Sequence, residues 1–220
     1  MIYRQGRNYE NLNKAIFDGT GEYGIPRLLA TGATAENFIG FNYAKSCKEP
    51  GGVGVHFFVD DYQFTRLWTQ PDAYLELLKR FKCVCTPDFS TYTDFPKAIQ
   101  IYNHYRKHWL GAYWQANGLE VIPTISWSDK ASFDWCFDGE PVGGVVAVSS
   151  VGTQLNRNSQ RLFMDGYREM LDRLKPSKIL FYGIIPDGCK DTNGAKLIPL
   201  TTFQDGLKKR VAAKREQDQG

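Results

Sequence analysis

The sequence of 220 residues is poor in histidine, low in net charge and without a long apolar run, and each shortage excludes a class of protein. No run approaches the ~18 apolar residues of a membrane span, and the N-terminal residues lack the apolar core of a signal peptide. We therefore predict a cytoplasmic protein that makes no membrane contact. A formal net charge of +3 provides no broad basic face, which duplex-binding proteins usually carry.

The cysteines and glycines do not form the motifs that define common sites. The five cysteines include no C-x-x-C pair, so neither a disulfide framework nor a zinc ribbon is indicated, and packing in a reducing compartment is expected. No G-x-x-x-x-G-K-[ST] loop and no G-x-S-x-G turn occurs, which argues against P-loop and nucleophile-elbow chemistry. The glycine runs at 51–54 and 143–144 precede predicted strands, whereas a dinucleotide fingerprint follows its strand.

What is present is typical of one globular domain. The chain has 42% hydrophobic and 23% charged residues, without internal repeats, a linker or a low-complexity segment. We assign residues 1–220 to a single α/β domain. Within it, residues 1–35 are predicted to be an irregular lead-in, and residues 201–220 a basic C-terminal helix and tail.

Short apolar runs of strand composition alternate with longer segments of helical period. The predicted strands are 38–43, 53–60, 83–86, 121–127, 143–149 and 178–184. The predicted helices are 62–81 (broken at Pro71), 95–117 (with Asp94 as N-cap and Gly118 as stop), 158–175 and 201–217. This alternation predicts a mostly parallel sheet, either TIM-barrel-like with a short or incomplete barrel, or an open doubly wound sheet. We favour the barrel because a polar residue ends nearly every strand.

Polar and aromatic residues follow the predicted strands, where ligands bind in parallel α/β folds. Asp60 and Asp88 follow neighbouring strands and are candidates for an acid–base pair, or for ligands of Mg²⁺, the candidate cofactor. The candidate ligand-binding residues are Asn42, Lys45, His56, Asp61, Ser90, Tyr92, Ser126, Trp127 and Ser149. Each has a structural alternative: Asp61 could cap a helix, Asp88 could form an Asx turn, and Trp127 could fill the core.

The histidines and the longest helix allow two interpretations each. His56 lies within a strand run, either as a partner of Asp60 or as a packed imidazole. His104 and His108 are four residues apart on the long helix, but Tyr105 stands where a hydrolytic H-E-x-x-H motif has glutamate, so we assign no metal ligand. The same helix interleaves aromatic residues with Arg106 and Lys107, which predicts contact with nucleic acid unless the helix simply covers a sheet.

Six strings along the chain resemble, in order, the domain-of-unknown-function family numbered 4417, which is frequent in phage and prophage genomes. These strings are FNYAKS (41–46), GVHFFVDDYQF (54–64), PDFSTYTDFP (87–96), WLGAYWQ (109–115), VIPTISW (121–127) and PSKILFYG (176–183). The resemblance implies a mobile-element setting, hence the cytoplasm of a host cell, and no residue roles. The replication-initiator label that some members carry is not supported, because His56 is followed by Phe57 and Phe58 instead of a second histidine.

Three hypotheses follow from these observations. The first is a polar, aromatic-walled pocket at the strand ends that binds a nucleotide-like ligand or single-stranded nucleic acid, with metal-assisted phosphodiester or glycosidic hydrolysis as its chemistry if it is an enzyme. The second is a non-enzymatic phage protein that contacts a host protein or sequesters a nucleotide. The third is a DNA-binding replication accessory. The sequence leaves open whether a reaction is catalysed and which oligomeric state the protein adopts.

Overall fold

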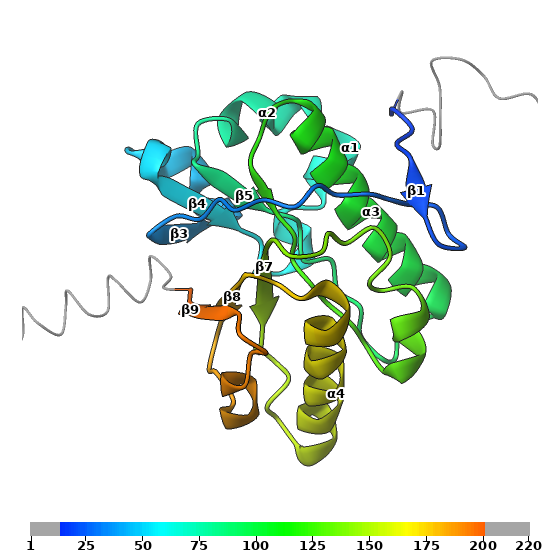
Figure 1. Ribbon diagram of the computed structural model, residues 1–220. Coiled ribbons are helices and arrows are strands. Elements are labelled where there is room, and N and C mark those ends of the chain that lie inside the picture. Colours follow the sequence, from blue (N-terminus) through cyan, green and yellow to red (C-terminus); the bar gives the residue numbers. More distant parts are fainter. Residues whose placement is uncertain (1–13, 201–220) are drawn as a thin grey trace, which may run out of the picture.

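The computed structural model describes residues 14–200, which form parallel sheets flanked by helices (Figure 1). One parallel sheet has four strands in the order β3 (Asn37–Gly40), β4 (Val53–His56), β5 (Cys83–Cys85) and β6 (Val121–Ile122). A second parallel sheet contains β7 (Val145–Ser149), β8 (Lys178–Tyr182) and β9 (Lys196–Pro199). The α/β class with parallel strands is therefore confirmed.

The strands follow one another in space as they do along the chain. A parallel bridge between Thr124 and Ala147 connects the end of the first sheet to β7, so the order from β3 to β9 contains no reversal. A doubly wound sheet would reverse its order at a switch point. The ring of His56, the last residue of β4, lies 5.1 Å from that of Tyr182, the last residue of β8, so the carboxyl ends of these two strands lie close together. The described strands thus run in sequential order through parallel sheets, with β3 and β9 at the outer edges.

Two long helices cover the strands. α4 (Arg157–Leu174) packs Phe163, Tyr167 and Met170 against β7 and β8. Alternate residues of β7 belong to different apolar clusters, Val145 and Ala147 to one and Val146 and Val148 to the other. This is the period of two that a strand buried on both faces requires.

The second long helix, α3 (Lys97–Ala116), ends as predicted but starts differently. Gly118 follows its last turn with φ +83°, a conformation that other residues adopt only with strain. Its N-cap is Pro96 without a side-chain hydrogen bond, so the prediction of Asp94 as N-cap is wrong. Asp94 lies two residues before this N-cap position, which is too early for its carboxylate to accept from the N–H groups of the first turn.

Several predicted elements are shorter or divided. The run 38–43 ends as a strand at Gly40 and continues as the 3₁₀ helix Phe41–Ser46, and the run 53–60 leaves the sheet after His56. The segment 62–81 contains the 3₁₀ helix Asp61–Gln63, α1 (Arg66–Thr69) and α2 (Asp72–Leu78).

Other elements fall outside the predicted set. In the lead-in, β1 (Gly19–Thr20) pairs antiparallel with β2 (Ile25–Pro26), and β9 was not predicted. The predicted helix 201–217 lies outside the described residues. Within residues 14–200, no helix is both long and apolar enough to cross a membrane.

Candidate functional site

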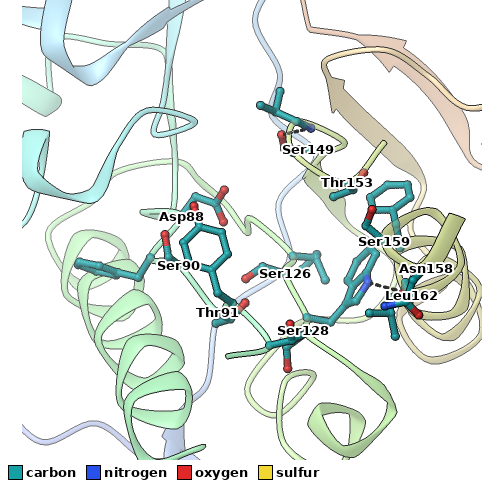
Figure 2. A pocket seen from close by; sticks show the side chains of 18 of the residues that line it. Asp88, Ser90, Thr91, Ser126, Ser128, Ser149, Thr153, Asn158, Ser159 and Leu162 are labelled. Atoms are coloured by element: carbon teal, nitrogen blue, oxygen red, sulfur yellow. Dashed lines mark hydrogen bonds between the residues drawn. The ribbon is translucent and has the colours of Figure 1, made fainter. Parts of the chain in front are cut away.

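Two adjoining cavities of about 520 and 470 Å³ lie at the carboxyl ends of the strands. Figure 2 shows the first of them. We call their union the strand-end cleft. Both cavities are lined by Asp88, Ser90, Tyr92, Ser149 and Val151, which places these residues where the two halves meet. Figure 2 shows Asp88 and Ser90 on one wall of the first cavity, opposite the residues contributed by α4.

The structure brings most of the predicted strand-end residues into this cleft. Those lining the first cavity are Asp88, Ser90, Tyr92, Ser126, Trp127 and Ser149. Asp60 and Asp61 line the second. Asn42 and Lys45 line neither cavity and lie exposed on the 3₁₀ helix Phe41–Ser46.

His56 lies beneath the cleft as a packed imidazole. Its ring stacks on Phe58 at 5.7 Å and contacts Tyr182, and both of these residues line the second cavity. Nδ1 accepts the backbone N–H of Phe58 at 3.2 Å. Burial lowers the pKa of His56 to about 4, so the ring is neutral at physiological pH. It supports the wall of the cleft and does not reach its lumen.

Of the two residues predicted to contact nucleic acid, Arg106 is half-buried and Lys107 is buried. The guanidinium of Arg106 stacks over Phe89 at 4.0 Å and over Tyr102 at 4.9 Å. Lys107 is buried, with its ammonium 2.8 Å from a carboxylate oxygen of Glu140. In this position Lys107 cannot reach a nucleic acid, because its charge is used within the core.

Asp61 is held in place by the loop that carries Asp88. Its two carboxylate oxygens accept hydrogen bonds from the backbone N–H and the hydroxyl of Ser90, at 3.1 and 2.9 Å. The carbonyl of Ser90 in turn accepts a bond from Asn103 on α3, at 2.6 Å. Asp61 is therefore a fixed negative charge at the edge of the cleft, and the position does not act as a simple helix cap.

Asp88 has the most perturbed carboxyl group of the cleft. Burial raises its pKa to about 7; the charge of Lys107 lowers it in part, and that of Asp61 raises it. No hydrogen bond to the Asp88 carboxylate occurs within the described part of the chain. A carboxyl group that exchanges its proton near neutral pH and faces a cavity is typical of a general acid or base.

Trp127 forms an aromatic wall that depends on a glycine. Its ring lies 5.4 Å from that of Phe163, and its Nε1 donates to the carbonyl of Leu162 at 3.2 Å. A Cβ atom at Gly166 would lie only 2.2–2.3 Å from three atoms of this ring, so only glycine lets the indole lie flat on α4. Tyr92 stands on the opposite loop with 62% of its surface exposed.

Sequence reasoning missed the contribution of α4 to the cleft. Its N-terminal residues line the first cavity, together with hydroxyl groups from neighbouring loops. The residues at the start of α4 are Asn156, Asn158 and Ser159, and the loop residues, which follow predicted strands, are Thr91, Thr93, Ser128 and Thr153. The sequence signal for this contribution is the capping box of α4, in which the side chain of Asn156 accepts from the backbone N–H of Ser159. This motif fixes the residue at which the helix starts.

The charge of the cleft is negative. Among the described residues, no lysine, arginine or histidine lines either cavity, whereas three aspartates do: Asp60, Asp61 and Asp88. Their oxygens are suitable ligands for a hard cation such as Mg²⁺. A phosphate group would lack a basic side chain here, so the arrangement suits a neutral, hydroxyl-rich ligand better than an anionic one.

Together, the parallel strands and the cleft define an α/β protein with a polar, acidic and aromatic site at its strand ends. The chain belongs to the family described as "Domain of unknown function (DUF4417)", whose profile matches residues 17–201. It is 38% identical over 212 residues to the Gene 1 protein of Mycobacterium phage L5, covering 95% of this chain and 92% of that protein. It is 37% identical over 211 residues to the Gene 1 protein of Mycobacterium phage D29, covering 94% and 78%. No solved structure matches. The predicted phage-associated family is thus confirmed.

Proposed function

We propose that this protein binds a nucleoside-like or nucleotide-like ligand in the strand-end cleft and hydrolyses its glycosidic bond, with Asp88 as the general acid. The observation that carries the proposal is the carboxyl group of Asp88, which lies where the two cavities meet and has its pKa raised to about 7. At neutral pH a sizeable fraction of this group holds a proton that it can donate.

The lining of the cleft supports the class of ligand. Trp127 and Tyr92 offer aromatic faces on which a base or a sugar ring can stack. Serine and threonine hydroxyls around them can exchange hydrogen bonds with sugar hydroxyls. A volume of about 520 Å³ falls within the usual range for a small-molecule site.

The carboxylates support the reaction. Asp88 would donate its proton to the leaving-group atom as the bond to the sugar C1 breaks, while a water oxygen bonds to C1 and gives its proton to Asp60. Asp61, fixed by Ser90, would stabilise the positive charge that develops on the sugar. Glycosidic chemistry is favoured over phosphodiester chemistry because the described lining holds no basic side chain for a phosphate. A phosphodiester substrate would require a cation such as Mg²⁺ on the aspartates.

Two measurements test the proposal on the full-length protein. Mass spectrometry of small molecules released on denaturation should identify a sugar-containing ligand. Purified protein incubated with a panel of nucleosides, nucleotides and short single-stranded oligonucleotides, with and without Mg²⁺, should release a free base or a reducing sugar. The variant Asp88→Asn should bind the same compound and lose turnover by about 10²-fold or more. Full turnover in Asp88→Asn would remove the assigned role, and no binding of any sugar-containing compound would remove the ligand class.

The exposed apolar residues around the cleft favour a second candidate, non-enzymatic contact with a host protein. These side chains are 64–84% exposed: Tyr62 lies on the 3₁₀ helix Asp61–Gln63, and Val151, Leu155 and Ile184 lie on the segments after β7 and β8. Exposed apolar groups of this kind mark many protein-binding surfaces. The double variant Leu155→Ser/Ile184→Ser should abolish binding to such a partner and leave the chemistry of the cleft unchanged, and retained binding would contradict this candidate.

A further inference from the structure

A second cluster of potential ligands lies in the core, and none of its residues lines the strand-end cleft. His104 and His108 of α3 and Glu140, which precedes β7, each offer an atom within 4.8 Å of the others. The two imidazoles are fully or almost fully buried, and so is the carboxylate side chain. The spacing of four residues places both imidazoles on one face of the helix.

The backbone determines which nitrogen of each imidazole carries a proton. Nδ1 of His108 lies 2.9 Å from the carbonyl oxygen of Pro26, and Nε2 of His104 lies 3.1 Å from that of Asp138. A carbonyl oxygen only accepts, so each of these nitrogens must be the N–H donor. This leaves Nε2 of His108 and Nδ1 of His104 with their lone pairs. Histidines that bind metals commonly donate their other nitrogen to a carbonyl in this way.

The contact between His108 and Glu140 requires a positive charge between them. Nε2 of His108 lies 2.9 Å from Oε1 of Glu140, so a lone pair would face a carboxylate oxygen. Either a second proton on His108 or a metal ion removes the repulsion. Oε1 also accepts from Lys107 at 2.8 Å, whereas Oε2 is buried and has no hydrogen-bond partner in the described structure. A buried carboxylate oxygen without a partner is costly, and a cation would satisfy it.

The contacts around the cluster favour a metal ion over a second proton. Oδ2 of Asp138 is buried and has no hydrogen-bond partner in the described structure, and the backbone carbonyl of the same residue lies 3.1 Å from Nε2 of His104. The ammonium of Lys107 already donates to Oε1 of Glu140 and to the carbonyl of Thr124, both at 2.8 Å. A proton on His108 would reach only Oε1, whereas a metal ion would also satisfy the buried Oε2 of Glu140.

We propose that His104, His108 and Glu140 bind a divalent transition metal of the zinc class. Two imidazoles and one carboxylate form a ligand set that zinc accepts. Glu140 would bind through its carboxylate, whose Oε1 faces Nε2 of His108 and whose Oε2 has no hydrogen-bond partner in the described structure. The carbonyls of Pro26 and Asp138 would orient the two imidazoles. The metal would tie α3 to the segment before β7, which makes its role structural.

The experiment measures metal content in full-length protein without a histidine tag. After treatment with EDTA and return of Zn²⁺, elemental analysis should find one zinc ion per chain, and Zn²⁺ should raise the midpoint of thermal unfolding. Substitution with Co²⁺ should produce visible absorption bands of a tetrahedral or five-coordinate site. Both signals should fall at least tenfold in Glu140→Gln and in His104→Gln.

Two controls separate this site from other sources of metal. Asp60→Asn removes a carboxylate of the cleft and should keep the full zinc content, and Cys136→Ser should do the same for the buried thiol nearby. Absence of zinc uptake by the wild-type protein, or an unfolding midpoint that Zn²⁺ does not raise, would overturn the proposal and leave a protonated His108 in its place. Zinc uptake and the unfolding midpoint are measured on the wild-type protein, so this test remains decisive even if the histidine variants fail to fold. Loss of zinc in Asp60→Asn would also overturn it. The ligand and turnover assays of the cleft are independent of these results.

Discussion

The replacement of Asp88 by asparagine should stabilise the protein at alkaline pH even though it disables the proposed reaction. Asp88 lies among protein atoms without a hydrogen bond from the described residues, and its pKa is raised to about 7 from an ordinary value of 3.8. Asparagine has nearly the same shape and never ionises. Its effect on stability therefore measures what the carboxylate costs the folded state.

The sign of the pH dependence follows from the direction of the pKa change. Between about pH 4 and pH 7 the unfolded chain has lost the proton of Asp88 while the folded protein still holds it. The folded state binds more protons, so this group lowers the free energy of unfolding as pH rises and has its full effect above pH 7. The difference between the two pKa values corresponds to about 4 kcal/mol, of which about 2–3 kcal/mol develops between pH 5 and pH 8. Because the side chain of Asp88 is partly exposed, we expect the change in the free energy of unfolding between pH 5 and pH 8 to be about 2 kcal/mol.

Urea unfolding followed by circular dichroism between pH 5 and pH 8 provides the test. The advantage of Asp88→Asn over the wild type should grow by about 2 kcal/mol across this range. Asp60→Asn, on an exposed side chain of the same cleft, should stay within about 0.5 kcal/mol throughout. Asp61→Asn should destabilise by about 1–3 kcal/mol, because Ser90 loses a charged acceptor. If the advantage of Asp88→Asn is independent of pH, the reasoning about its environment is wrong.

Three further predictions concern a packing contact, a helix cap and a buried ion pair, and all are measured by urea unfolding. Gly166→Ala should lower the free energy of unfolding by about 1–2 kcal/mol, because the added Cβ would overlap the ring of Trp127. In a Trp127→Ala background the same substitution should raise the free energy of unfolding by about 0.5–1 kcal/mol. Equal effects in both backgrounds would contradict the contact. Asn156→Ala should cost about 1 kcal/mol through loss of the α4 cap, whereas an unchanged unfolding midpoint would show that the cap contributes nothing. Glu140→Gln should cost about 3–5 kcal/mol, with little dependence on salt, because the buried ammonium of Lys107 loses its charged partner and keeps only the carbonyl of Thr124. A small effect that salt removes would place the pair at the surface.

The sequence predicted the elements whose signal is local. The strand cores at β4, β7 and β8, the start of α4 close to residue 158 and the end of α3 before Gly118 all follow from apolar runs, periodicity and a glycine with positive φ. The β9 strand was missed because Lys196–Pro199 is at most half-buried and contains a proline, so it lacks the apolar pattern of a core strand. Strand ends were placed too late at residues 43 and 60, where apolar composition continues after hydrogen bonding within the sheet stops.

Much of the cleft was also predictable, for a topological reason. Parallel strands that are joined by helices point the same way, so the residues after each strand meet at one edge. This reasoning predicts from the sequence that Asp88, Ser126 and Ser149 lie close together, and all three line the first cavity. It could not show that Lys45 lies outside the cavities or that α4 supplies Asn158 and Ser159, because both depend on where a connection turns.

The chain by itself determined the α/β class, the parallel order of the strands and the edge at which polar side chains gather, because these follow from patterns of neighbouring residues. Only the tertiary structure decided which charged groups are buried and with which partners. Lys107 comes from α3 and Glu140 from a segment more than thirty residues later, and their ion pair exists only once α3 has packed. The raised pKa of Asp88 has the same origin, since burial is a property of the assembled fold and of no local segment.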